Sequence, residues 1–132
     1  MAAGNPKDEY VDVSINLRQF MTMRFAQLTL YLALTGFLLK TLLDQADSSH
    51  PFLDVVLQGG GAITTLLFWV HQERTQAYWN HFARRAAELE KELGFKQYTN
   101  RPQAGLVSSF KAMRLFFIVV LLFWLSTFVW FT

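Results

Sequence analysis

The sequence contains no cysteine and only three prolines among its 132 residues. Without cysteine there is no disulfide framework, no thiolate nucleophile and no cysteine-based metal site. Charged residues are also few, at 17% of the chain, whereas 52% of the residues are hydrophobic, which is unusual for a water-soluble domain of this size. The apolar residues are clustered into long runs, and this clustering favours membrane spans over a globular interior.

Three apolar segments are long enough to cross a bilayer: residues 25–43, 52–71 and 115–131. At about 1.5 Å per residue, even the shorter segments come close to the roughly 30 Å of a hydrocarbon core. The eight residues of the turn 44–51 are too few for anything but an antiparallel arrangement of the first two spans. The sequence therefore predicts an all-α integral membrane protein with three transmembrane helices.

The second span runs without a break into an amphipathic segment. Apolar side chains recur there at helical spacing, and we expect this contact stripe to be covered by another helix. Gly94 follows the last of them and is suited to end a helix, so residues 72–114 are predicted to form a helical hairpin. The stripe consists of Tyr78, Phe82, Ala86, Leu89 and Leu93.

The N-terminal segment, residues 1–24, carries two conflicting signals. Asn5, Pro6 and the acids that follow resemble a helix start. Apolar and polar residues alternate from Val11 to Arg18, which is strand periodicity. A lone strand has no partner in this chain, so we expect a helix that starts near Ser14 or earlier and is continuous with the first span. Strand pairing between protomers is the alternative.

The distribution of basic residues predicts the orientation. Of the twelve Lys and Arg residues, only Lys40 lies outside residues 1–24 and 72–114. Because basic residues are enriched on the cytoplasmic side, we expect the N-terminus and the hairpin in the cytoplasm. The 44–51 turn and the C-terminus then face outward, in what we expect to be a bacterial inner membrane.

Two ionisable residues, Lys40 and Asp54, are predicted to lie at similar depth near the outer ends of the first two spans. Charged residues inside spans often mark a conduction path. Both residues are close enough to the boundary to reach the headgroups, so we interpret them as a structural ion pair.

A glycine triplet, Gly59–Gly61, follows Gln58 within the second span. Broken helices of transporters expose backbone carbonyls to ions at such places. More commonly, small residues let two helices approach closely while a neighbouring amide bonds across the contact. We predict that these four residues pack against another helix.

Basic residues of the hairpin are predicted to contact lipid headgroups, because juxtamembrane Lys and Arg are attracted to anionic lipid. Four glutamates between residues 73 and 92 dilute the positive charge, which makes nucleic acid an unlikely partner. The candidate headgroup residues are Arg84, Arg85, Arg101, Lys111 and Arg114.

Catalytic signals are weak. Arg74 and His81 have the spacing of the Arg-x6-His motif of HEPN-type ribonucleases, but two residues seven apart on a helix are better explained as an interfacial arginine and a solvated histidine. The three histidines are too scattered for a metal site, and we expect no cofactor.

These features predict a non-enzymatic membrane subunit, either a homo-oligomeric scaffold or an accessory component of a larger membrane complex. The alternative is an oligomeric gated pore controlled through the hairpin and lined by Gln27, Thr35, Gln58 and Thr64. Conduction paths usually need a polar or charged ring, and its absence at mid-span favours the first hypothesis.

Overall fold

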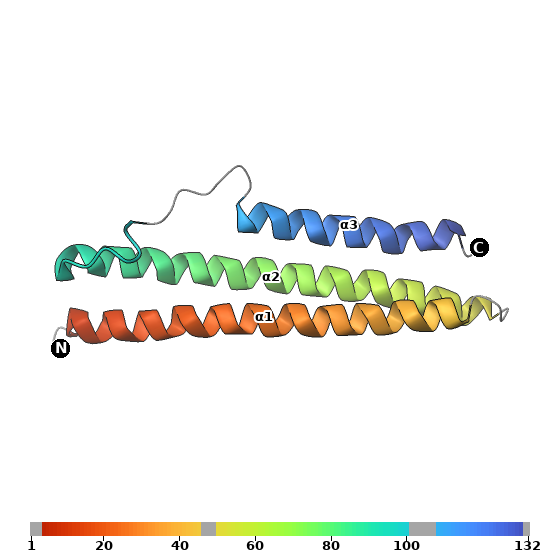
Figure 1. Cartoon of the computed structure of the whole chain (residues 1–132), viewed down its shortest axis with the longest axis horizontal. Coiled ribbons are helices and arrows are strands. Elements are labelled where there is room, and N and C mark those ends of the chain that lie inside the picture. The colour runs from red at the N-terminus through yellow and green to blue at the C-terminus, as the bar shows by residue number, and fades with distance from the viewer. Residues whose placement is uncertain (1–3, 46–49, 101–107, 131–132) are drawn as a thin grey trace.

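The computed structural model describes residues 4–45, 50–100 and 108–130, and within these ranges all regular structure is helical. Figure 1 shows the three helices: α1 (Pro6–Asp44), α2 (Pro51–Leu93) and α3 (Ser109–Trp130). Each contains a stretch that is long and apolar enough to cross a membrane. The predicted all-α architecture with three candidate spans is therefore confirmed.

The N-terminal segment is part of α1. The side chain of Asn5 accepts a hydrogen bond from the backbone N–H of Lys7 at 3.1 Å, Pro6 begins the helix, and Asp8 and Glu9 lie in its first turn. These are the stabilising features of a helix N-terminus. The helical interpretation is confirmed, and the strand alternative is wrong for this segment.

α2 is one continuous helix of 43 residues, which corresponds to about 64 Å at 1.5 Å per residue. It ends where the sequence indicated. Gly94 adopts the left-handed conformation, with φ of 78°, and its N–H donates to the carbonyl oxygen of Glu90 at 2.8 Å. Glycine takes this conformation without the steric cost of a Cβ atom.

The helices lie in a row, with α2 between α1 and α3 (Figure 1). α1 and α2 are antiparallel and run side by side over nearly their whole length, whereas α3 accompanies only the half of α2 nearer its N-terminus. Beyond α3 the structure is a two-helix rod. We call this rod the stalk; it comprises residues 6–24 of α1 and 72–93 of α2.

Two small hydrophobic cores hold the row together. The first joins the helices of the stalk, and the second joins all three helices at the opposite end of the molecule. The stalk core contains Val13, Leu17, Ala83, Ala86 and Leu89, and the second contains Leu42, Leu57 and Trp124.

Between the two cores, Tyr31 of α1 connects all three helices. Its ring is fully buried and lies 5.3 Å, between centroids, from both Phe68 of α2 and Phe117 of α3. Its hydroxyl forms a 3.0 Å hydrogen bond with the hydroxyl of Thr65. This contact satisfies two polar groups where the membrane interior would offer no water.

α3 is not uniformly exposed to lipid, although its sequence is almost entirely apolar. Phe117, Trp124 and Thr127 are buried against the other helices. One face of α3 therefore packs within the chain, because even an apolar helix gains packing contacts from a complementary neighbour.

Candidate functional site

The predicted contact stripe of α2 faces α1. Leu89 and Ala86 are buried, Phe82 is partly buried, and Leu93 is half-buried. Tyr78 is 54% exposed, and one face of its ring stacks on Phe20 at a centroid distance of 6.2 Å. The stripe is therefore covered largely from within the chain, which leaves the outer surfaces of the stalk for any partner.

Glu90, at the end of α2, is the centre of a polar cage that the sequence did not indicate. Its side chain is fully buried and accepts hydrogen bonds from four donors. The backbone N–H of Tyr98 lies 2.8 and 2.9 Å from its two oxygens, and that of Thr99 lies 2.7 Å from Oε2. The hydroxyls of Thr99 and Tyr10 donate at 2.8 and 3.0 Å.

The cage keeps Glu90 ionised despite its burial. Burial raises the pKa of the carboxyl and is the largest single influence on it, but the donors from Tyr98, Thr99 and Tyr10 together outweigh it, so the pKa lies below the ordinary 4.5. For Tyr10, burial and the adjacent carboxylate raise the pKa of the phenol. Glu90 therefore acts as a fixed acceptor that ties residues 98–99 and α1 to the end of α2.

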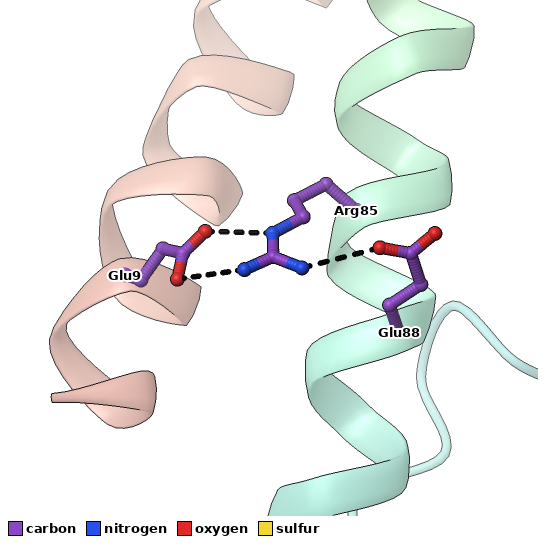
Figure 2. A network of polar contacts seen from close by, with 3 residues as sticks. All are labelled: Glu9, Arg85 and Glu88. Atoms are coloured by element: carbon purple, nitrogen blue, oxygen red, sulfur yellow. Dashed lines mark hydrogen bonds and ion pairs between the residues drawn. The ribbon is translucent and has the colours of Figure 1, made fainter. Parts of the chain in front are cut away.

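A second polar contact clamps the stalk one turn away (Figure 2). Arg85 of α2 donates to both oxygens of Glu9 on α1, at 2.7 Å from Nε and 3.0 Å from Nη2, and to Glu88 at 3.2 Å. The hydrogen bond from Arg85 is the main reason that the pKa of Glu9 lies below its ordinary value. This two-pronged geometry fixes the angle between the helices better than a single charge contact would.

A third polar contact, an ion pair, joins α2 to α3 at the base of the stalk. Arg114 donates to both oxygens of Glu73 at 2.6 and 2.8 Å, and its guanidinium also lies over the ring of Phe110, 4.0 Å from the centroid. The indole N–H of Trp69 donates to the same carboxylate at 3.2 Å. α3 is therefore held against α2 where the spans begin.

These pairs bear on the predicted headgroup residues. Arg85 and Arg114 are engaged by carboxylates of the same chain. Arg84 and Lys111 are exposed, and Arg101 lies outside the described residues. Within the described part of the chain, Arg84 and Lys111 are the members of this set that have no ion pair to break before they contact lipid.

The structure separates the members of the glycine triplet. Gly61 is buried against Trp124, and a Cβ atom there would overlap the indole ring. Nothing lies within 4 Å of the corresponding positions at Gly59 and Gly60. Gln58 is buried and donates to the carbonyl oxygen of Thr127 at 3.2 Å. Close packing within the chain therefore involves Gln58 and Gly61. For Gly59 and Gly60, packing against a helix of another chain stays a prediction.

Lys40 and Asp54 do not form the predicted ion pair. Lys40 lies 3.8 Å from Asp44, one turn further along α1, and both side chains are largely exposed. Oδ1 of Asp54 is buried without a hydrogen-bond partner among the described residues. Similar depth does not determine the pairing, because Asp44 lies one turn from Lys40 on the same face of α1.

Two of the polar residues assigned to a pore in the alternative hypothesis bond to other helices of the same chain. Gln27 lies 2.7 Å from Nε2 of His71, and Gln58 is bonded to α3. Thr35 and Thr64 are only partly buried. Within the chain, Gln27 and Gln58 serve as contacts between neighbouring helices.

The outer edge of the stalk carries apolar side chains that none of the described residues covers. Val11 and Ile15 of α1 are 50% and 53% exposed. They are four residues apart and therefore lie one helical turn apart on the same face of α1. The buried Val13 and Leu17 are displaced from them around the helix and face α2 instead.

No protein-family model matches the chain, and searches of curated proteins and of solved structures found no significant match either.

Proposed function

We propose that the protein is a non-enzymatic membrane scaffold that self-associates through the outer face of its stalk. The observation that carries this proposal is the exposed Val11–Ile15 pair, on a segment that the charge distribution assigns to the cytoplasm. Exposed neighbouring apolar side chains in water favour a protein contact. A two-helix rod covers only one side of each helix, so this face needs a further partner.

A second copy of the chain is the partner that fits this face. Copies inserted in one membrane share the same orientation and depth. Val11 and Ile15 of one copy therefore lie at the same height as Val11 and Ile15 of the next. Equivalent patches at equal height are what a symmetric cyclic assembly requires.

The stalk is built to present this face rigidly. The Glu90 cage closes the far end of the rod, and the Arg85–Glu9 contact fixes α1 against α2. An ordered surface loses less conformational entropy on association than a flexible one. This rigidity supports a scaffold role better than the role of a mobile sensor.

The proposal includes the location and the orientation. The three apolar helices support a membrane protein, and the basic residues at the stalk side support a cytoplasmic N-terminus and hairpin with an outward C-terminus. We assign the chain to a bacterial inner membrane on this basis. Its proposed partners are membrane lipids and other copies of the chain. If the protein is an accessory subunit instead, its partner is a larger membrane complex.

Chemical catalysis has no support in this geometry. The most buried carboxylate, Glu90, has four donors directed at it and no open side for a substrate. The pore hypothesis is also weaker, since Gln27 and Gln58 bond within the chain. A pore would therefore have to open between protomers.

The decisive measurement is the mass of the full chain in mild detergent. We expect a closed homo-oligomer for the parent and a smaller species for Ile15→Glu. Ala77→Glu is the matched control, because it adds the same side chain at an exposed position of α2, the other helix of the stalk, and should leave the mass unchanged. A monomeric parent would refute self-association.

A flux assay separates the scaffold from the pore. Liposomes containing the parent protein should show no ion flux above that of empty liposomes. A homo-oligomer that conducts ions would favour the pore hypothesis instead.

A further inference from the structure

A cavity of about 150 Å³ lies where the stalk meets the spans, and all three helices contribute to its walls. Arg24 and Gln72, which immediately flank the first and second apolar spans, provide its polar side. Its remaining lining is mostly apolar and includes Phe25, Leu28 and Met113, with Ser109 at the start of α3. The cavity therefore has a basic end at headgroup depth and apolar walls next to the hydrocarbon region.

Gln72 holds the guanidinium of Arg24 in place. Gln72 is only 8% exposed. With its amide oxygen turned toward α1, it accepts from Nη2 and Nε of Arg24 at 2.8 and 2.9 Å. The opposite orientation would direct the amide NH₂ at the guanidinium donors. Gln72 thus satisfies two of the five N–H groups of the arginine and leaves three for another acceptor.

The charge of Arg24 has no counter-ion in the described part of the chain. The ion pairs found there use Lys40, Arg85 and Arg114, and the partner of Arg24 is a neutral amide. Arg24 is also partly buried, unlike Arg18 six residues earlier on the same helix. A partly buried cation without an anion is costly, and an anionic ligand would offset that cost.

We propose that this cavity binds the phosphate of an anionic phospholipid. Arg24 donates to the phosphate oxygens, which match the fork of a guanidinium. Ser109, the first residue of α3, lines the cavity. The start of a helix carries partial positive charge, although the N–H of Lys111 in this turn already donates to the side chain of Ser108. One acyl chain follows the apolar wall formed by Phe25, Leu28 and Met113.

A lipid fits the cavity better than a soluble phosphate does. The apolar walls would stay in contact with water if only an inorganic anion were bound, whereas an acyl chain covers them. Arg24 also differs from the exposed basic residues of the stalk, which attract any anionic surface through charge alone. A built cavity selects one lipid molecule and retains it.

Native mass spectrometry of the full purified chain tests the proposal. The chain is titrated with phosphatidylglycerol, with phosphatidylcholine of the same acyl chains, and with inorganic phosphate. We expect phosphatidylglycerol to bind more tightly than phosphatidylcholine. Loss of the charge-assisted hydrogen bonds in Arg24→Gln should weaken that binding about tenfold, and Arg18→Gln, an equal change of charge at an exposed position, should not weaken it.

Two further variants keep the proposal testable if Arg24→Gln does not fold. Gln72→Glu places a carboxylate against Arg24 in the position of the existing amide, so it should reduce phosphatidylglycerol binding while helicity is retained. Leu28→Trp should also reduce phosphatidylglycerol binding, because the larger side chain would occupy the space next to the apolar wall that the acyl chain needs.

Three results would overturn the assignment. The first is equal retention of phosphatidylglycerol and phosphatidylcholine by the parent chain. The second is equal weakening by Arg18→Gln and Arg24→Gln, which would indicate a diffuse charge effect. The third is displacement of phosphatidylglycerol by an equal concentration of inorganic phosphate, which would assign the cavity to a soluble anion.

Discussion

The indole ring of Trp124 on α3 packs directly against the backbone of Gly61 on α2, in the space that a side chain at position 61 would occupy. Trp124 is fully buried there. This contact joins the second and third helices in the membrane, and it depends on glycine because any Cβ atom would displace the ring.

Gly61→Ala tests that contact. We expect it to destabilise the chain by about 1–3 kcal/mol, the usual cost of overpacking a close contact. Gly60→Ala is the control, because nothing lies within 4 Å of its added methyl group. Thermal unfolding in detergent compares the two, and equal midpoints would show that Trp124 does not require glycine at position 61.

Glu90→Gln tests the cage at the end of the stalk. The amide keeps one acceptor oxygen but turns an NH₂ group toward donors, so we expect a loss of at least about 2 kcal/mol. Hydrogen–deuterium exchange should accelerate at the amides of Tyr98 and Thr99, which donate to Glu90. Exposed Glu92 provides the control: Glu92→Gln should change neither amide, and unchanged exchange in Glu90→Gln would contradict the cage.

Acid should open the same cage. The pKa of Glu90 is below its ordinary value of 4.5 in the folded chain, so its ionisation stabilises the fold. That contribution is fully present above the unfolded pKa and is lost as the pH falls through the folded pKa. Protection of the Thr99 amide, corrected for the intrinsic exchange rate, should therefore decline below about pH 4.5. In Glu90→Gln this decline should be absent.

Arg85→Gln should loosen the N-terminal end of α1. Arg85 holds both oxygens of Glu9 across the two helices, whereas its neighbour Arg84 forms no ion pair with the described residues. Exchange should accelerate in the first turns of α1 in Arg85→Gln and stay at the parent rate in Arg84→Gln. Added salt should loosen these turns in the parent in the same direction, because exposed ion pairs are screened.

Tyr31→Phe removes the hydroxyl that bonds to Thr65 between the first two helices. Interhelical hydrogen bonds in membranes contribute about 0.6 kcal/mol on average, so a small loss of stability is expected. Tyr78→Phe, in the exposed part of the stalk, should have no effect. A loss far above about 1.7 kcal/mol would mean that the ring packing of Tyr31 also changes.

Local signals in the sequence predicted most of the fold. The three apolar segments, the start of α1 at Asn5 and Pro6, and the end of α2 at Gly94 each depend on residues close together in the chain. The apolar stripe likewise showed which side of α2 needs a cover. Hydrophobic length, helix caps and periodicity act through the chain's own backbone, so they can be recognised before any tertiary contact is known.

The candidate sites were less predictable because they depend on pairs of helices. Nothing in the sequence around Glu90 indicated that donors from Tyr10, Tyr98 and Thr99 would surround its side chain. Tyr10 lies 80 residues away in the sequence. Glu90 follows Leu89 of the apolar stripe and stands four residues before Gly94. A glutamate in that position is the signal that could have suggested the cage. The Arg24 cavity likewise needs all three helices.

The sequence by itself determined where this chain can cross a membrane, which residues can start its first helix and where its second helix ends. Only the tertiary structure decided that Gly61, rather than Gly60, meets Trp124, and that Lys40 lies near Asp44 instead of Asp54. The physical reason is the rotation and offset of one helix against another. Residues one position apart on a helix point about 100° apart, so a small rotation determines which of them touches the neighbour.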